Sequence, residues 1–243
     1  MFSLDKLKVY DKALASAASL AQHSRSWDKR HAVTDQLLRA SESFVLNLAE
    51  GARLRSAAKR QHVVDYAIGS ALECAACLDS AQIKEFLCQD EALQEKRSLC
   101  EVVKMMVGLK KAWSVEAFHE EPSRYGEPAE WLFPHERLDA YRLSLEFMRW
   151  FHGLPGAPKL STRPLRQVDH AGTSLVLNIA EANGRYASGE RRNLFEIAES
   201  AVVRVGTYLE LCTRTDKLDP EQKACAMALL DRIASMLRGL GSG

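Results

Sequence analysis

The sequence predicts an all-α protein built from two tandem up-and-down antiparallel four-helix bundles. One observation is that the octapeptide Ser43-Phe-Val-Leu-Asn-Leu-Ala-Glu50 returns, with two apolar exchanges, as Ser174-Leu-Val-Leu-Asn-Ile-Ala-Glu181, displaced by 131 residues. The same displacement holds without a break from residue 7 to residue 109, so the chain carries two copies of one domain. Apolar residues also recur at helical spacing, and no segment shows the two-residue alternation of a strand.

The first copy is expected over residues 1–115 as four helices with short connections, the pattern of an up-and-down bundle. Apolar residues at three- and four-residue spacing open the chain, and a second helix is expected from Lys29 to Arg53. The stripe is lost between Gly51 and Ala57, where Ser56 has the character of an N-cap for the third helix. Before Pro122 the chain holds no proline that would interrupt a helix.

An interdomain linker is expected over residues 116–133, because prolines, a glycine and glutamates replace the helical stripe there. The second copy, expected over 134–243, follows the same plan. Its helices are predicted from Leu138 to Phe151, up to Glu181, from Ser188 to Thr213, and from Pro220 to Leu240. The last of them begins with Asp219 as N-cap and proline at the first helical position.

The composition is that of an ordinary soluble protein, with 47% hydrophobic and 27% charged residues. The formal net charge is +1, so any anion-binding surface has to be a local patch. The first residues lack the apolar core of a signal peptide, and no apolar run is long enough to span a bilayer. We therefore expect a cytoplasmic protein without a membrane partner.

A polar cluster is expected where the repeated octapeptide places Ser, Asn and Glu on one helical face. Its members are Ser43, Asn47 and Glu50 in the first copy, and Ser174, Asn178 and Glu181 in the second. A polar pocket inside the bundle is one interpretation. We favour a hydrogen-bonded structural cluster, since buried polar groups normally satisfy one another. Glu181 also has Arg185 four residues on, an ion-pair spacing.

Basic residues surround the turn between the second and third helices of both copies, and we expect nucleic-acid contacts there. They are Arg53, Arg55, Lys59 and Arg60 in the first copy, and Arg185, Arg191 and Arg192 in the second. Cations at a helix C-terminus gain from its dipole, which explains Arg53 and Arg55 without a ligand. Lys59 and Arg60 open a helix, where the dipole disfavours them, and a phosphate backbone would explain their position.

No catalytic residue, metal or cofactor is expected. One carboxylate per bundle lacks the second acid or the nucleophile that hydrolysis needs. The only Glu-x-x-His spacing that would serve a di-iron bundle, Glu116 to His119, falls in the linker. Cys74 and Cys77 have the spacing of half a zinc site, but their counterparts in the second copy are Val205 and Tyr208, so we interpret them as buried thiols.

Segments of the first copy resemble a family of small four-helix bundles. These segments are Leu7-Lys-Val-Tyr10, Gln36-Leu-Leu-Arg-Ala40, Asn47-Leu-Ala-Glu-Gly51, and Ala67-Ile-Gly-Ser70 followed by Glu73. The family includes the protein encoded in intervening sequences of bacterial large-subunit ribosomal RNA and the accessory variability determinant of diversity-generating retroelements. The second copy has diverged, with Gly51 replaced by Ala182 and Glu73 by Arg204. Because family members usually have one bundle per chain, this chain resembles a tandem duplication.

This resemblance implies a non-enzymatic protein. Accessory variability determinants form ring-like homopentamers with basic surfaces. By similarity to them, the chain would bind a structured template RNA and a reverse transcriptase, support mutagenic retrohoming, and form a homo-oligomer.

Two alternatives stay open. One is an oligomerising protein-binding scaffold without a nucleic-acid role, in keeping with the nearly neutral charge. The other is a helical HEPN-like ribonuclease, for which Arg55 with His62, or Arg163 with His170, would supply the Arg and His pair.

Overall fold

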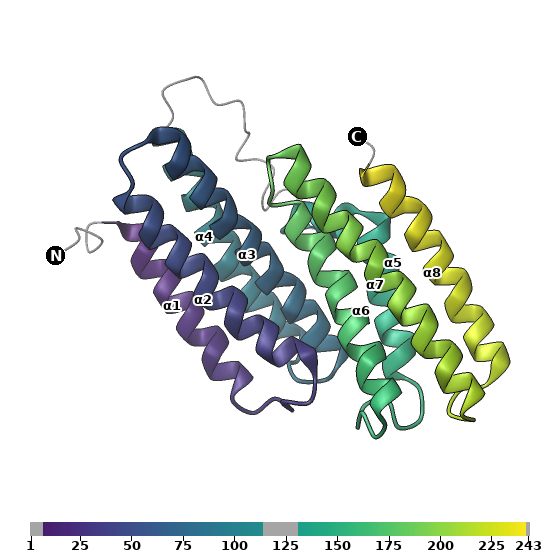
Figure 1. The fold of residues 1–243 in the computed structure, drawn as a ribbon. Helices are drawn as coiled ribbons and strands as arrows, with labels where there is room; N and C mark the ends of the chain where they lie inside the picture. The colour runs from purple at the N-terminus through teal and green to yellow at the C-terminus, as the bar shows by residue number, and fades with distance from the viewer. Residues whose placement is uncertain (1–6, 114–130, 242–243) are drawn as a thin grey trace.

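The computed structural model describes residues 7–113 and 131–241, and within these ranges it is helical without any strand. The described residues form eight α-helices and one short 3-10 helix, arranged as two four-helix bundles side by side (Figure 1). The predicted all-α class with two tandem bundles is therefore confirmed. None of the described helices combines the length and apolar character that crossing a bilayer requires.

Bundle 1 consists of α1 to α4, and bundle 2 of α5 to α8. The helices of bundle 1 are α1 (Lys8–Ser24), α2 (Ala32–Arg53), α3 (Ala57–Ile83) and α4 (Gln89–Ala112). Those of bundle 2 are α5 (Asp139–His152), α6 (Arg163–Ala182), α7 (Ser188–Arg214) and α8 (Pro220–Gly241). In each bundle every helix packs against the next one in the chain, and the first packs against the last (Figure 1). This is the closed up-and-down order that the sequence predicts.

Side-chain caps account for several helix starts. The Ser56 hydroxyl accepts a hydrogen bond from the Lys59 amide at the start of α3, as expected for an N-cap. The Asp219 carboxylate accepts from the Glu221 amide at 2.8 Å, so the predicted start of α8 is also confirmed. Helix α2 begins at Ala32 instead of Lys29, because the preceding residues form a turn in which the His31 amide bonds to the Asp28 carbonyl.

The start of bundle 2 contains an element that the helical stripe does not reveal. A 3-10 helix, η3 (Pro134–Arg137), precedes α5, and the Glu136 carboxylate accepts hydrogen bonds from the backbone amides of Leu132 and Phe133. Most of the linker expected at 116–133 lies outside the described residues, as does the Glu116–His119 pair. The division of the chain at that linker remains a prediction.

The two bundles pack closely through α3, which contacts both α5 and α6, and through α2, which contacts α6. Buried apolar residues from both bundles belong to one contiguous core cluster. At the end of α6 the backbones almost touch: a Cβ placed on Gly184 would lie 2.6 Å from the Gly69 Cα. Only glycine at position 184 allows this approach.

The surfaces that join the bundles are not equivalent in the repeat. The 131-residue displacement relates α2 to α6 and α3 to α7. The contact between α3 and α6 therefore joins the third helix of one copy to the second helix of the other. A contact of this kind is heterologous, because it joins two different surfaces of the repeated domain. Bundle 1 therefore retains a face on α2 whose counterpart on α6 is covered, and bundle 2 retains a face on α7 whose counterpart on α3 is covered.

Candidate functional site

The basic turn of bundle 1 lies between α2 and α3, and three of its four basic residues are exposed. These are Arg53, Arg55 and Lys59. Arg60 is half-buried, because its guanidinium donates to the Leu54 carbonyl and lies 5.0 Å from the centre of the Trp113 ring. Arg60 thus closes the turn from inside, and the outer surface of the turn presents the other three cations.

The corresponding turn of bundle 2 lies at the same end of the molecule (Figure 1), but its cations are placed differently. Arg185 is only 9% exposed; it pairs with Glu181, and its guanidinium lies 3.9 Å from the centre of the Tyr66 ring of bundle 1. The predicted Glu181–Arg185 spacing thus gives a real ion pair, in the contact between the bundles. Arg191 is half-buried and Arg192 is exposed, 4.0 Å from Glu196.

The histidines considered for a ribonuclease lie at the surface. His62 packs edge-on against the Tyr66 ring, and its Nε2 lies 3.8 Å from the Glu190 carboxylate of bundle 2. Arg163 is the first residue of α6, and His170 is exposed two turns later. The structure gives His62 a packing role at the bundle contact.

The octapeptide cluster has the same internal geometry in both copies. Asn47 Nδ2 donates to the Ser43 carbonyl at 2.8 Å and to its hydroxyl at 3.1 Å, and Asn178 Nδ2 makes the corresponding bonds to Ser174 at 2.6 and 3.2 Å. Ser43 also bonds to the Ser70 hydroxyl of α3 at 2.9 Å. Glu50 is exposed.

A polar pocket of about 390 Å³ lies where this cluster meets the other bundle. Ser43 of the first octapeptide and Ser174, Asn178 and Glu181 of the second line it together with α3 residues, among them Glu73. Burial raises the pKa of Glu73 to about 8, and the nearby charge of Glu181 adds to the effect. In each octapeptide the serine and the asparagine bond to each other, whereas Glu50 does not join them. The pocket lies between the bundles, and not inside one bundle as the sequence suggested.

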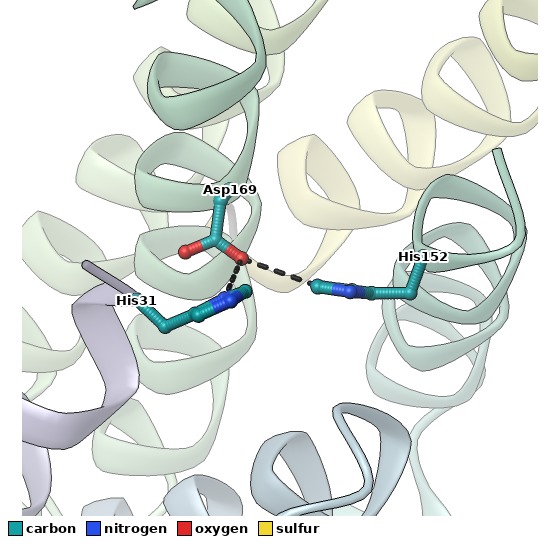
Figure 2. Close-up of side chains that lie close together, drawn as sticks. All are labelled: His31, His152 and Asp169. Atoms are coloured by element: carbon teal, nitrogen blue, oxygen red, sulfur yellow. Dashed lines mark hydrogen bonds and ion pairs between the residues drawn. The ribbon is translucent and has the colours of Figure 1, made fainter. Parts of the chain in front are cut away.

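A second polar cluster joins the bundles at the C-terminal end of α3. It consists of His31, Lys84, His152 and Asp169. The imidazoles of His31 and His152 approach one carboxylate oxygen of Asp169, at 3.4 and 3.2 Å (Figure 2). The buried Lys84 ammonium bonds to the same oxygen and lies 3.2 Å from His152 Nε2. Burial alone would raise the pKa of Asp169, but hydrogen bonds from both histidines and the charge of Lys84 lower it below its ordinary range.

The His31, His152 and Asp169 ligand atoms lie within 4.8 Å of one another, a spacing that would suit a metal ion. The Lys84 ammonium, however, already lies against all three side chains. In a second such group, Asp79, His135 and Glu136, the Lys96 ammonium lies against the two carboxylates, 2.7 Å from Asp79 and 2.5 Å from Glu136. In both clusters a lysine supplies the cation, so we interpret them as ion networks that hold the bundles together.

The cysteine interpretation agrees with the structure. Cys74 and Cys77 are fully buried in α3, and burial raises the pKa of both thiols well above the ordinary value. A thiol in such surroundings stays protonated, so it is a poor nucleophile and a poor metal ligand. These two residues pack as small apolar side chains.

Comparison with known protein families gives one match that covers most of the chain. A family model described as 23S rRNA-intervening sequence protein matches residues 5–108 and again residues 136–239. The two matched ranges correspond to bundle 1 and bundle 2, displaced by the same 131 residues as the octapeptide. No solved structure matches the chain.

Proposed function

Because the chain belongs to the 23S rRNA-intervening sequence protein family, with the family's bundle present twice, we propose that it is a non-enzymatic accessory protein that binds RNA. The observation that carries this proposal is the exposed basic turn of Arg53, Arg55 and Lys59. Lys59 stands in the first turn of α3, where the helix dipole disfavours a cation, so an anionic partner gives it a reason to be there. Arg192, at the same end of bundle 2, extends the surface. We do not assign Arg60 and Arg185 to the RNA-binding surface, because their guanidinium groups bond within the protein.

The proposal is tested by the salt dependence of binding to a structured RNA. The triple variant Arg53/Arg55/Lys59→Ala should bind more weakly, and the slope of log affinity against log salt should become shallower by about two to three units. A matched control, Arg25/Lys29/Lys217→Ala, removes three exposed cations from the opposite end of the bundles and should keep the wild-type slope. Equal slopes for the wild type and the first variant would refute the assigned surface.

We also propose that the protein partner is a reverse transcriptase, as in mutagenic retrohoming. The likeness of the first copy to accessory variability determinants supports this. Co-purification with a candidate reverse transcriptase, repeated after ribonuclease treatment, distinguishes direct contact from a bridge of RNA. The HEPN alternative predicts instead that the protein cleaves RNA and that His62→Ala abolishes the cleavage.

A second candidate function, an oligomerising scaffold, is favoured by apolar residues left uncovered on α2 and α7. On α6, Leu177 is 3% exposed, whereas its repeat counterpart on α2, Leu46, is 67% exposed. On α3, Leu72 is fully buried, whereas its counterpart on α7, Val203, is 68% exposed. Since the bundles join through α3 and α6, a second chain would join through the uncovered α7 of one molecule and α2 of the next. We infer a head-to-tail homo-oligomer.

Mass measurements in solution test this assembly. Leu46→Glu and Val203→Glu should each reduce the oligomer, whereas Leu14→Glu, which changes an exposed leucine on α1, should not. Mixing the two interface variants should give dimers, because each retains one intact face of a heterologous contact. A mixture that remains monomeric while the wild type oligomerises would refute the head-to-tail arrangement.

A further inference from the structure

The inter-bundle pocket described above is lined mainly by polar side chains, and their hydrogen-bond arrangement leaves donors available to a ligand. The Ser174 hydroxyl oxygen accepts from Asn178 Nδ2 at 3.2 Å and from Arg204 Nη2 at 3.4 Å. With both lone pairs engaged, this hydroxyl can act towards a ligand only as a donor. In the Ser43–Ser70 pair one hydroxyl donates to the other, so one O–H again remains to be donated.

The charges of the pocket also favour an anion. Arg39 and Arg185 line it from α2 and from the turn after α6. Arg185 pairs with Glu181, and Arg39 Nη1 lies 3.9 Å from the Asp35 carboxylate on the same helix. Arg185 Nη1 is buried without a hydrogen-bond partner among the residues that the structure describes. Glu73 faces Arg39, Glu181 and Arg185, and its raised pKa keeps much of it protonated at neutral pH, when it adds a donor and no charge. Arg39, Arg185, Glu181 and Glu73 then sum to a net charge of about +1, and the opposite charges of Asp35 beside Arg39 and Arg204 beside Ser174 leave this sum unchanged.

We propose that this pocket binds a tetrahedral oxyanion, as carried by a phosphomonoester. Residues with donor groups line it from α2, α3 and α6, which suits an anion whose oxygens point in several directions better than a planar carboxylate. A volume of about 390 Å³ leaves room for a small organic group attached to the phosphate. The lining has few apolar side chains, so the attached group would itself be polar, such as a sugar. The site does not depend on the exposed basic turn.

Direct titration with sulfate, inorganic phosphate and a nucleoside 5′-monophosphate tests the site. Arg39 is largely exposed, so Arg39→Gln should leave the fold intact and weaken binding about tenfold, the loss of one charged hydrogen bond. Ser174→Ala, which removes the assigned donor, should also weaken binding. Arg25→Gln, an exposed arginine remote from the pocket, should bind like the wild type. If the three anions do not bind the wild type, or if Arg39→Gln binds as tightly as the wild type, the proposal is wrong.

The pH dependence provides an independent readout through Glu73. Sulfate does not titrate near neutral pH, so its binding reports the protein groups alone. Above the Glu73 pKa of about 8 the affinity should fall by up to tenfold per pH unit, because the ionised carboxylate repels the anion. Glu73→Gln should bind sulfate with little pH dependence over the same range. A wild-type affinity that does not change across this range would exclude the role of Glu73.

Two sources of the phosphomonoester are distinguished by paired ligands. A free metabolite predicts that a nucleoside monophosphate binds and the matching nucleoside does not. An RNA end predicts that a 5′-phosphorylated oligoribonucleotide binds more tightly than its 5′-hydroxyl form, and that Arg39→Gln removes the difference. The Arg53/Arg55/Lys59→Ala variant should retain this preference for the phosphate while it loses general RNA affinity, so failure of one proposal leaves the other testable.

Discussion

The close approach of Gly69 and Gly184 makes Gly184→Ala the most direct test of how the bundles are joined. An alanine Cβ at 184 would lie 2.6 Å from the Gly69 Cα, 2.8 Å from its amide nitrogen and 3.3 Å from the Ile68 carbonyl carbon. All three are backbone atoms, so no flexible side chain can move aside. The α6–α7 turn has to move away from α3 by roughly 1 Å to restore van der Waals contact.

The expected cost follows from this geometry. Overpacking of a well-packed contact costs about 1–3 kcal/mol. Alanine also loses less chain entropy than glycine on folding, which offsets about 0.4–1 kcal/mol. The net destabilisation should be about 1–2 kcal/mol. Gly69→Ala should cost less, although the two glycines touch, because its Cβ would meet the side chain of Arg185 at 3.2 Å and that side chain can adjust.

Urea unfolding followed by circular dichroism and by tryptophan fluorescence measures this difference. The control is Gly239→Ala in α8, where an added Cβ meets no atom of the described part of the chain within 4 Å. That variant should be as stable as the wild type or more stable by up to about 1 kcal/mol, because alanine is the better helix former. If Gly184→Ala is as stable as Gly239→Ala, the backbones do not approach as described and the argument fails.

Three further predictions concern titratable groups. Burial raises the pKa of Glu73 above its value in the unfolded chain, so the free energy of unfolding decreases as the pH rises from about 4.5 to about 8. The Glu73→Gln variant should not show this decrease. In urea unfolding it should be more stable than the wild type by a few kcal/mol at pH 8 but not at pH 4. Lys84→Met leaves the buried Asp169 without its cation and should lower the free energy of unfolding by about 3–5 kcal/mol. The double variant Lys84→Met/Asp169→Asn should recover much of this stability. A much smaller loss in the single variant would contradict the ion network. Cys74 and Cys77 should react with a thiol reagent only after denaturation, while the exposed cysteines react at once; rapid labelling of all thiols in the native protein would contradict their burial.

The helices were predictable from the sequence because each depends on local signals. Apolar spacing places the buried face of a helix, and Ser56 and Asp219 mark its beginning within a few residues. The displacement of the octapeptide then extends the plan of one bundle to the other. The 3-10 helix was missed because four residues are too few to show a periodicity.

The contacts between the bundles were not predictable, because they bring together residues that no spacing relates. Lys84 and Asp169 come from different copies, and neither corresponds to the other in the repeat. The i, i+4 spacing indicated the Arg185–Glu181 pair, but it could not show that Tyr66 covers the guanidinium. One local signal was available for the pocket. The octapeptide carries polar residues on one helical face, and the apolar residues beside them indicate that this face is turned away from solvent.

The heterologous joining of the bundles gives every repeat position two different surroundings, and this has a consequence for separating or exchanging the copies. Bundle 1 produced alone would expose the apolar face of α3 to water and leave Lys84 without Asp169. A chimaera with two first copies would place a second Leu72 where the chain now has Val203. Autonomous folding of one half therefore requires solubilising substitutions on α3, and a consensus of the two copies would suit neither position. The two copies have one architecture but separate design requirements.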